Sequence, residues 1–349
     1  MSTVYVGHAT TGKDPVGYIA KSVNGGVTFA ATGFDAETAI PLCLYHFTEN
    51  IGICLAAWWG VNSYVQIYKT TDGWATHSLI KSELIGGDYS ERYWNEIRYG
   101  TGVLLAVADY NILFRSTDNG DTWTKISTGL PTSTTQKLTG LSYAGGTWFI
   151  MAINGASSWR VIHSHDEGLT WDLGTSHAKP GGAAGTPGIG HIWMGTSLAG
   201  WLGWYDFFST ADMGETTTLV SDLRLARVEY PLVMLYAEGD DYSDVDLYKI
   251  NGDGSITKIC DLVSAYCTLC KMMKAPDGTI YLNTGFSNTL YSSDGVALTT
   301  LGSVDAEHII LCEYALAEAA PIIAAKSLWR VERVDDSGRS PRNVGRSVR

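Results

Sequence analysis

One eight-residue string returns along the chain at an almost constant spacing. It reads Ser-Thr-Asp-Asn-Gly-Asp-Thr-Trp from residue 116, and a second string from residue 164 repeats its serine, aspartate, glycine, threonine and tryptophan. Weaker copies begin at residues 22, 70 and 210, so the five starts are 48, 46, 48 and 46 residues apart. A regular period of this length indicates a fold built from repeated supersecondary units.

The copies, called boxes below, share a hydroxyl, a carboxylate or amide, and a glycine at alternate positions. The box at 210 has Thr217 in place of the aromatic residue, and the box at 70 has its glycine, Gly73, one place early. We expect a structural role in the turn for Ser22, Asn24 and Gly26; Thr70 and Asp72; Ser116, Asp118, Gly120 and Trp123; Ser164, Asp166, Gly168 and Trp171; and Thr210, Asp212 and Gly214.

Each box follows an apolar triplet, and two more apolar or alternating runs lie upstream of it. Two degraded copies, at 248–259 and 290–301, keep the order of strand, polar turn and strand. Four strands per 46 to 48 residues is typical of a β-propeller blade, whereas solenoids have shorter periods and helical repeats need a 3.6-residue pattern. The sequence therefore predicts an all-β propeller of four-stranded antiparallel blades.

Seven boxes or remnants predict seven blades. The first unit lacks an inner strand, and the segment 308–335 has the apolar composition to supply it and so close the ring. Because this segment is long enough for more than one strand, eight blades remain the alternative. We place the propeller at residues 1–336 and a basic C-terminal arm at 337–349.

The box pattern resembles the Asp-box, or BNR repeat, of sialidases and many other propellers. In that family the box is a peripheral turn between the third and fourth strands of a blade, away from the central site. Side-chain capping by aspartate and a glycine with positive φ agree with such a turn. The resemblance implies that Asp118 and Asp166 stabilise turns rather than bind ions or act in catalysis.

Charge and composition restrict the choice of partner and compartment. The net charge of −12 and the pI near 5.0 argue against binding nucleic acid through its phosphates. No apolar run is long enough to span a membrane, and the N-terminal residues do not resemble a secretory signal, so we expect cytoplasmic synthesis. Six cysteines in a chain of this length favour reduced, buried thiols; Cys267 and Cys270 form a CxxC, but a complete set of four zinc ligands is missing.

The sequence carries no sialidase signature. The resemblance would require three converging arginines, a tyrosine nucleophile and an acid, yet the first arginine is Arg92, and neither it nor the arginines at 98, 115, 160, 224 and 227 has the family's motif context. A glycosidase needs two carboxyls flanking the scissile bond, for which Glu96, Asp109 and Glu229 are candidates. Sequence alone does not bring these three together, so we predict no catalytic residues, no metal and no cofactor.

Several other stretches have both a structural and a functional interpretation. The acidic segment 238–246 has oxygens for calcium but lacks EF-hand spacing, which favours a solvated loop. The aromatic stretches 56–60 and 200–208 could stack on sugars, although blade packing is the better explanation. The Gly/Pro-rich segment 177–191 is the preferred contact surface, because long loops on a propeller face often carry recognition.

The C-terminal arm is basic and contains no acid. We expect its arginines to pair with carboxylates of a neighbouring acidic subunit; they are Arg339, Arg342, Arg346 and Arg349.

These observations lead to the hypothesis of a non-enzymatic structural or adhesion propeller in a larger assembly. Intact boxes without a catalytic or secretion signal are similar to propeller-bearing bacteriophage tail, fibre or decoration proteins, which implies a virion location, protein partners and a possible cell-surface glycan. The alternative is a glycan-binding or glycoside-hydrolase propeller related to sialidases. Its distinguishing feature would be two carboxyls, or arginines with an acid, facing the ring centre. A third interpretation is a cytoplasmic assembly factor resembling the photosystem assembly propellers.

Overall fold

The computed structural model places the fold within residues 1–317. In the described part of the chain no helix occurs, and therefore none that is long and apolar enough to cross a membrane. The structure describes residues 3–9, 17–36, 39–58, 64–84, 96–108, 111–131, 136–154, 158–178, 191–203, 206–221, 223, 225–236, 244–263, 270–274, 279–284, 289–293, 296–303 and 308–314.

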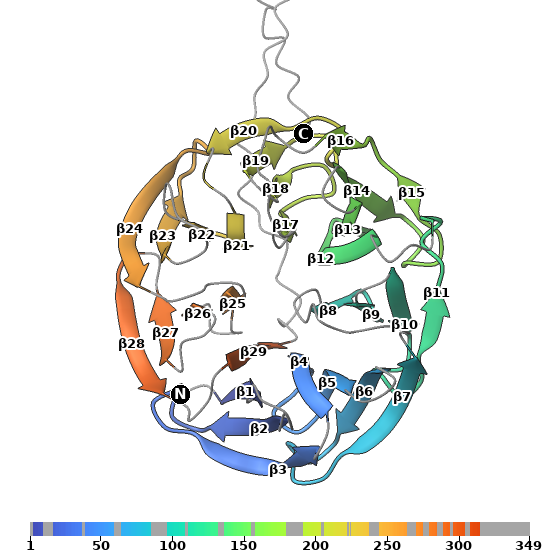
Figure 1. The fold of residues 1–349 in the computed structure, drawn as a ribbon, viewed down its shortest axis with the longest axis vertical. Coiled ribbons are helices and arrows are strands. Elements are labelled where there is room, and N and C mark those ends of the chain that lie inside the picture. Colours follow the sequence, from blue (N-terminus) through green and yellow to red (C-terminus); the bar gives the residue numbers. More distant parts are fainter. Residues whose placement is uncertain are drawn as a thin grey trace, which may run out of the picture. The chain divides into compact units, whose positions relative to one another are not determined.

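Seven four-stranded antiparallel blades form a propeller (Figure 1). Blade 1 contains β1 (Val4–Ala9), β2 (Gly17–Ser22) and β3 (Ala30–Ala36). Blades 2 to 4 follow in chain order and consist of β4 (Ala39–His46), β5 (Gly52–Trp58), β6 (Tyr64–Thr70) and β7 (Ser78–Leu84); β8 (Glu96–Gly100), β9 (Val103–Ala108), β10 (Ile112–Ser116) and β11 (Thr124–Ile126); and β12 (Gln136–Ala144), β13 (Thr147–Asn154), β14 (Ser158–Ser164) and β15 (Asp172–Leu173), with the short β16 (His177–Ala178) also paired to β14.

The last three blades repeat the same order. They consist of β17 (His191–Met194), β18 (Gly200–Gly203), β19 (Phe207–Thr210) and β20 (Thr218–Ser221); β21 (Leu225–Glu229), β22 (Leu232–Tyr236), β23 (Asp244–Ile250) and β24 (Ile256–Val263); and β25 (Cys270–Lys274), β26 (Ile280–Thr284), β27 (Thr289–Ser293) and β28 (Leu298–Ser303).

The chain end closes the ring. Strand β29 (His308–Tyr314) pairs antiparallel with β1 and becomes the inner strand of blade 1, and it also pairs in parallel with β4 of blade 2. The prediction that this segment completes the first blade is confirmed, because one strand of it fills the vacant inner position. Seven blades are therefore correct, and the eight-bladed alternative is wrong.

The sequences of the strands are nearly continuous runs of apolar residues, because both faces of each blade are buried. On β9, Leu104 and Ala106 pack toward blade 2, whereas Val103, Leu105 and Val107 pack toward blade 4. Seven such clusters lie among the described residues, one between each pair of consecutive blades. These interfaces hold the ring through apolar burial and leave the inner strands free to carry polar side chains.

Candidate active site at the ring centre

Two inner strands carry mirrored polar triplets. Strand β8 begins with Glu96, Ile97 and Arg98, and β21 ends with Arg227, Val228 and Glu229. Because side chains alternate along a strand, the two charged residues of each triplet share one face. The order of acid and base is opposite on the two strands, so each charge of one triplet has an opposite partner on the other.

The two triplets meet in one ion-pair cluster. Oε1 of Glu96 accepts hydrogen bonds from Nη2 of Arg98 and from Nη2 of Arg227, each at 3.0 Å. Oε2 of Glu96 accepts a hydrogen bond from the backbone N–H of Leu141 on β12, at 2.9 Å. Nη2 of Arg98 also lies 3.5 Å from Oε2 of Glu229. Both carboxylate oxygens of Glu96 are therefore engaged.

This cluster reaches across the ring. Strand β8 belongs to blade 3 and β21 to blade 6, which is the largest separation that a ring of seven blades allows (Figure 1). The Glu96–Arg227 hydrogen bond joins residues 131 positions apart in the chain. The cluster therefore lies at the centre of the propeller rather than within one interface between neighbouring blades.

The environment of Glu96 keeps it ionised. Its side chain is only 2% exposed, and burial alone would raise its pKa. The guanidinium groups of Arg227 and Arg98 outweigh burial and hold the pKa of Glu96 well below its usual range. A carboxylate of this kind positions cations and does not act as a general acid near neutral pH.

His191 adds a neutral imidazole to the same place. It opens β17 in blade 5, is fully buried, and has Nε2 3.7 Å from Oε1 of Glu96. Burial, assisted by the positive charge of Arg227, lowers the pKa of His191 to about 3. Within the described residues, neither of its ring nitrogens has a hydrogen-bond partner. A buried polar side chain without such partners is uncommon and marks a place where a ligand or water is expected.

Exposure separates the cluster into two parts. Arg98 is the most accessible member, at 22% exposure of its side chain, followed by Glu229 at 7%. Arg227 and Glu96 are more deeply buried. Arg98 is thus the cation that an anionic or carbonyl-bearing molecule would reach first, and Glu229 is the acid beside it.

The structure brings together two of the three carboxyls that the sequence offered. Glu96 and Glu229 meet through Arg98, while Asp109 lies outside the described residues. Two of the arginines that lack a sialidase motif context, Arg98 and Arg227, belong to this cluster among the described residues. Since both oxygens of Glu96 are bound, the pair does not resemble the two available carboxyls of a glycosidase. His191 was not among the candidates from the sequence. The opposite order of acid and base in the two triplets is the sequence pattern that could have identified the other residues of the cluster.

The five boxes lie away from this centre, each between the third and fourth strands of its blade. In blade 3, Oγ of Ser116 accepts the N–H of Gly120 at 2.9 Å and donates to Asp118, and Asp118 accepts both the N–H and the hydroxyl of Thr122. The other boxes repeat the contacts to backbone N–H groups through Ser22 and Asn24, Thr70 and Asp72, Ser164 and Asp166, and Thr210 and Asp212.

Blade 2 shows why its glycine seemed displaced. The N–H that Thr70 accepts belongs to Trp74, which occupies the glycine position with φ of 70°. Its indole is fully buried and donates to Nε2 of His46 at 2.7 Å. Burial of a large side chain therefore stabilises a backbone conformation that normally favours glycine.

Several sequence predictions fall wholly or partly outside the described residues. They are the arginines at 339, 342, 346 and 349, most of the acidic segment 238–246, most of the segment 177–191, Trp59 and the side chains of Cys267 and Cys270. The predicted arm and its protein partners remain predictions. Of the described aromatic residues in 200–208, Phe207 is fully buried, whereas Trp201 and Phe208 are only partly buried; Cys43 and Cys54 are buried thiols.

No protein-family model matches the chain, and no curated protein matches it in sequence. Among solved structures, the periplasmic gluconolactonase of Pseudomonas aeruginosa is similar, with a TM-score of 0.61 and 11% identity over 88% of this chain and 98% of that one. A Lactobacillus plantarum protein has a TM-score of 0.59 and 13% identity, over 89% and 98%. A candidate 6-phosphogluconolactonase of Bacteroides fragilis has a TM-score of 0.57 and 11% identity, over 89% and 96%. At these identities the likeness shows the fold.

These findings correct the functional prediction. The sequence led to a non-enzymatic tail or fibre subunit of a bacteriophage, whereas the similar propellers include one named as an enzyme and others named as candidate enzymes. The prediction failed because the sequence has no sialidase motif and does not bring the candidate carboxyls together, since the charged residues of the ring centre are spread over inner strands of different blades. Arginines with an acid at the ring centre were the feature expected to distinguish an enzyme-like propeller, and the structure has this feature.

Proposed function

We propose that this protein is a propeller hydrolase that opens the lactone ring of a sugar acid at the ring centre. The observation that carries the proposal is the buried cluster of Glu96, Arg98, Arg227, Glu229 and His191, which reaches across the ring. The names of the similar propellers supply the substrate class, since they include a gluconolactonase and candidate 6-phosphogluconolactonases.

Lactone hydrolysis needs two kinds of group. Water adds to the carbonyl carbon, the carbonyl oxygen becomes an oxyanion, and the ring C–O bond then breaks to give a hydroxyl and a carboxylate, with release of one proton. A fixed cation near the oxyanion lowers the barrier most effectively when it is already oriented before reaction. A base within hydrogen-bond reach must accept the proton of the attacking water.

Arg98 fits the first role. Its guanidinium is held by Glu96 at 3.0 Å and approached by Glu229 at 3.5 Å, and its side chain is the most exposed of the cluster. Glu96 and Arg227 act as positioning residues because they are buried and bound to each other.

Glu229 is the candidate base. Its contact with the cluster is longer than those of Glu96, whose two oxygens are both engaged, so Glu229 retains more capacity to bind water. His191, whose Nε2 lies 3.7 Å from Oε1 of Glu96, offers a second acceptor in its neutral form. A phosphorylated or carboxylated substrate would add a favourable interaction with the arginines.

The test is a pH-stat measurement of proton release by the full chain with glucono-1,5-lactone and with its 6-phosphate. Turnover above the spontaneous rate is expected for at least one of them. Arg98→Met and Glu229→Gln should each lower kcat/KM by roughly 10²-fold or more. Lys125→Met, which removes the outer pair with Glu83, is the matched control and should leave turnover unchanged.

Two outcomes would overturn the proposal. One is the absence of turnover of either lactone by the folded wild-type chain. The other is full activity in both Arg98→Met and Glu229→Gln, which would move the reaction away from the ring centre.

We also propose that the five boxes are Asp-box turns in which the recurring hydroxyl, carboxylate or amide, and glycine residues have a structural role. Their side chains cap backbone N–H groups within the turn, as in Ser164, Asp166 and Thr170. Hydrogen bonds from the hydroxyl and the backbone of Thr170 lower the pKa of Asp166 to about 2, which leaves its oxygens committed to the turn.

A further inference from the structure

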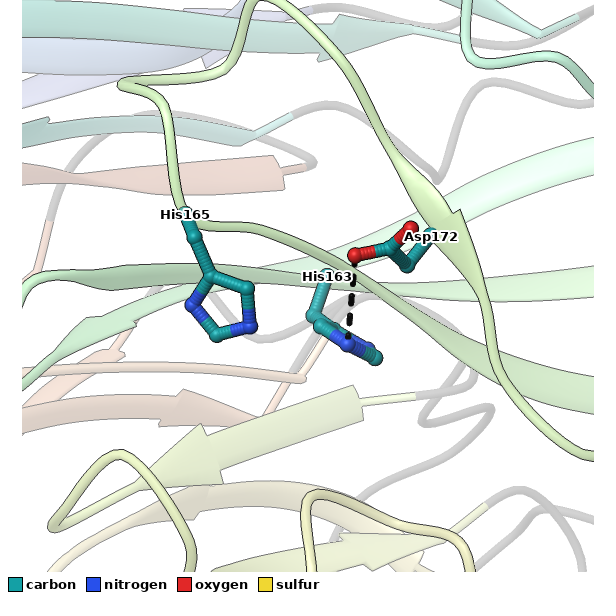
Figure 2. A group of neighbouring side chains, drawn as sticks. All are labelled: His163, His165 and Asp172. Atoms are coloured by element: carbon teal, nitrogen blue, oxygen red, sulfur yellow. Dashed lines mark ion pairs between the residues drawn. The ribbon is translucent and has the colours of Figure 1, made fainter.

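Two histidines and an aspartate lie close together at the box of blade 4, one within the box and one on each side of it in the chain. His163 lies on β14 directly before Ser164, and His165 directly follows that serine. Asp172 lies on β15 opposite His163. The rings of the two histidines lie 5.1 Å apart between centroids, and the pairing of β14 with β15 brings Asp172 to His163. Figure 2 shows the three side chains converging on one side of the turn.

The donor atoms are close enough for one ion. One donor atom from each residue can be chosen so that all three lie within 4.8 Å of one another, and Nε2 of His163 is 3.8 Å from Oδ2 of Asp172. A tetrahedral zinc ion with bonds of about 2.0–2.2 Å holds its ligand atoms roughly 3.3–3.5 Å apart. Small side-chain rotations at the exposed His165 and Asp172 would close the difference.

His163 supplies an independent sign of a ligand. Its side chain is only 10% exposed, and within the described part of the chain Nδ1 has no hydrogen-bond partner. Burial first, and then the neighbouring His165, lower its pKa, while Asp172 and Glu215 act in the opposite direction. Histidine binds metals in its neutral form, and burial favours that form.

His165 is oriented by a second contact. Its Nδ1 lies 3.1 Å from the hydroxyl of Thr147 on β13. Figure 2 shows its other ring nitrogen on the side of His163. A polar group that fixes one nitrogen of a metal-binding histidine is the usual outer contact of such sites.

The repeat provides an internal comparison. At the position before the box, blades 2 and 3 have Lys69 and Arg115, which bind the box of the next blade through Asp121 and Glu167. Blade 4 has His163 there instead. Only this box combines that histidine with a second one and a carboxylate across the strand pair. Blade 4 therefore has an imidazole where blades 2 and 3 have an ammonium or a guanidinium group.

We propose that His163, His165 and Asp172 bind one divalent transition-metal ion, represented by Zn²⁺, with a fourth position open to water. Two imidazoles and one carboxylate are a common zinc donor set. The site lies on blade 4, in the outer strands beside the box, and is separate from the cluster on the inner strands β8, β17 and β21.

The test is isothermal titration of the full chain with Zn²⁺ alone, with Co²⁺ absorption as a readout of coordination. We expect one site whose affinity falls by roughly tenfold or more in His165→Ala and in Asp172→Asn. Both residues are exposed, so both variants should fold; their unfolding midpoints without metal verify this. His177→Gln is the matched control, because it removes a histidine of the same blade while its amide can still donate to the carbonyl of Gly214.

Absence of Zn²⁺ binding up to about 1 mM would overturn the proposal. Equal affinity in the wild type, His165→Ala and Asp172→Asn would do the same, because the ion would then bind elsewhere. Neither outcome depends on lactone turnover.

Discussion

Removing the charge of Glu96 should destabilise the protein far more than removing any outer ion pair. At 3.0 Å and an effective dielectric constant of about 20, each arginine attracts Glu96 by about 5 kcal/mol before desolvation is counted. Glu96→Gln leaves two guanidinium groups at the ring centre with one carboxylate, Glu229. Breaking a buried pair in this way costs about 3–5 kcal/mol of unfolding free energy.

The same cost is expected for Arg227→Met, which leaves two carboxylates with one guanidinium. The double variant restores the balance, because only Arg98 and Glu229 then carry charge. Its loss should therefore be smaller than the sum of the single losses by at least about 2 kcal/mol. Lys125→Met, whose pair with Glu83 is exposed, should cost no more than about 1 kcal/mol.

Urea unfolding followed by tryptophan fluorescence measures all four variants, and refolding from urea confirms reversibility. The coupling energy of the double-mutant cycle is calculated from the unfolding free energies of the wild type, the two single variants and the double variant. Additivity of the two single losses within about 0.5 kcal/mol would refute the reasoning, since the two side chains would then be independent. A loss below about 1 kcal/mol in Glu96→Gln would refute it as well.

Three further predictions concern the blades. Gly120→Ala should lower stability by more than Gly102→Ala. Both glycines have φ of 82°, but only at Gly120 would a Cβ lie 2.4 Å from an isoleucine of blade 2. The urea unfolding midpoints of the two variants measure the difference. Asp166→Ala should cost about 1–2 kcal/mol of unfolding free energy and Asp166→Asn less, because Asn24 makes the equivalent turn bonds in blade 1. Burial lowers the pKa of His46 to about 4, so the unfolded chain binds more protons at this residue between about pH 6.5 and 4. The contribution of His46 to stability should fall by about 3 kcal/mol as pH drops through this window. His46→Gln should therefore make that part of the stability profile less steep, and the slope that remains includes His191, whose pKa is about 3.

The fold was predictable because its signal is local. A box needs only eight consecutive residues to form its hydrogen bonds, from Ser116 to Trp123 for example, and its recurrence sets the blade period. Closure by β29 followed from counting the strands of the first unit. The exchange of glycine for Trp74 was not predictable, because it depends on the contact with His46 at the end of β4, 28 positions earlier in the chain.

The ring centre had no comparable local signal. Glu96 and Arg227 are 131 positions apart, and either triplet alone reads as an ordinary polar face of a strand. Their pairing depends on the blade count, since only a ring of known size sets β8 against β21. His191 depends on the same geometry. The proposed metal ligands of blade 4 span only ten positions, from His163 to Asp172, but the box motif explains most of that stretch and carries no signal of metal binding.

The charges at the centre are not needed to hold the ring together. Seven apolar interfaces already join consecutive blades, and β29 links the chain end to both β1 and β4. Well-packed apolar side chains at a buried ion pair are often as stabilising as the pair itself or more so. A purely structural centre would therefore gain little from five polar side chains, one of which, His191, leaves both ring nitrogens without hydrogen-bond partners in the described part of the chain. The cost of burying them is better explained by chemistry that needs an oriented cation and an acceptor at one place, which is the arrangement that Arg98, Glu229 and His191 provide.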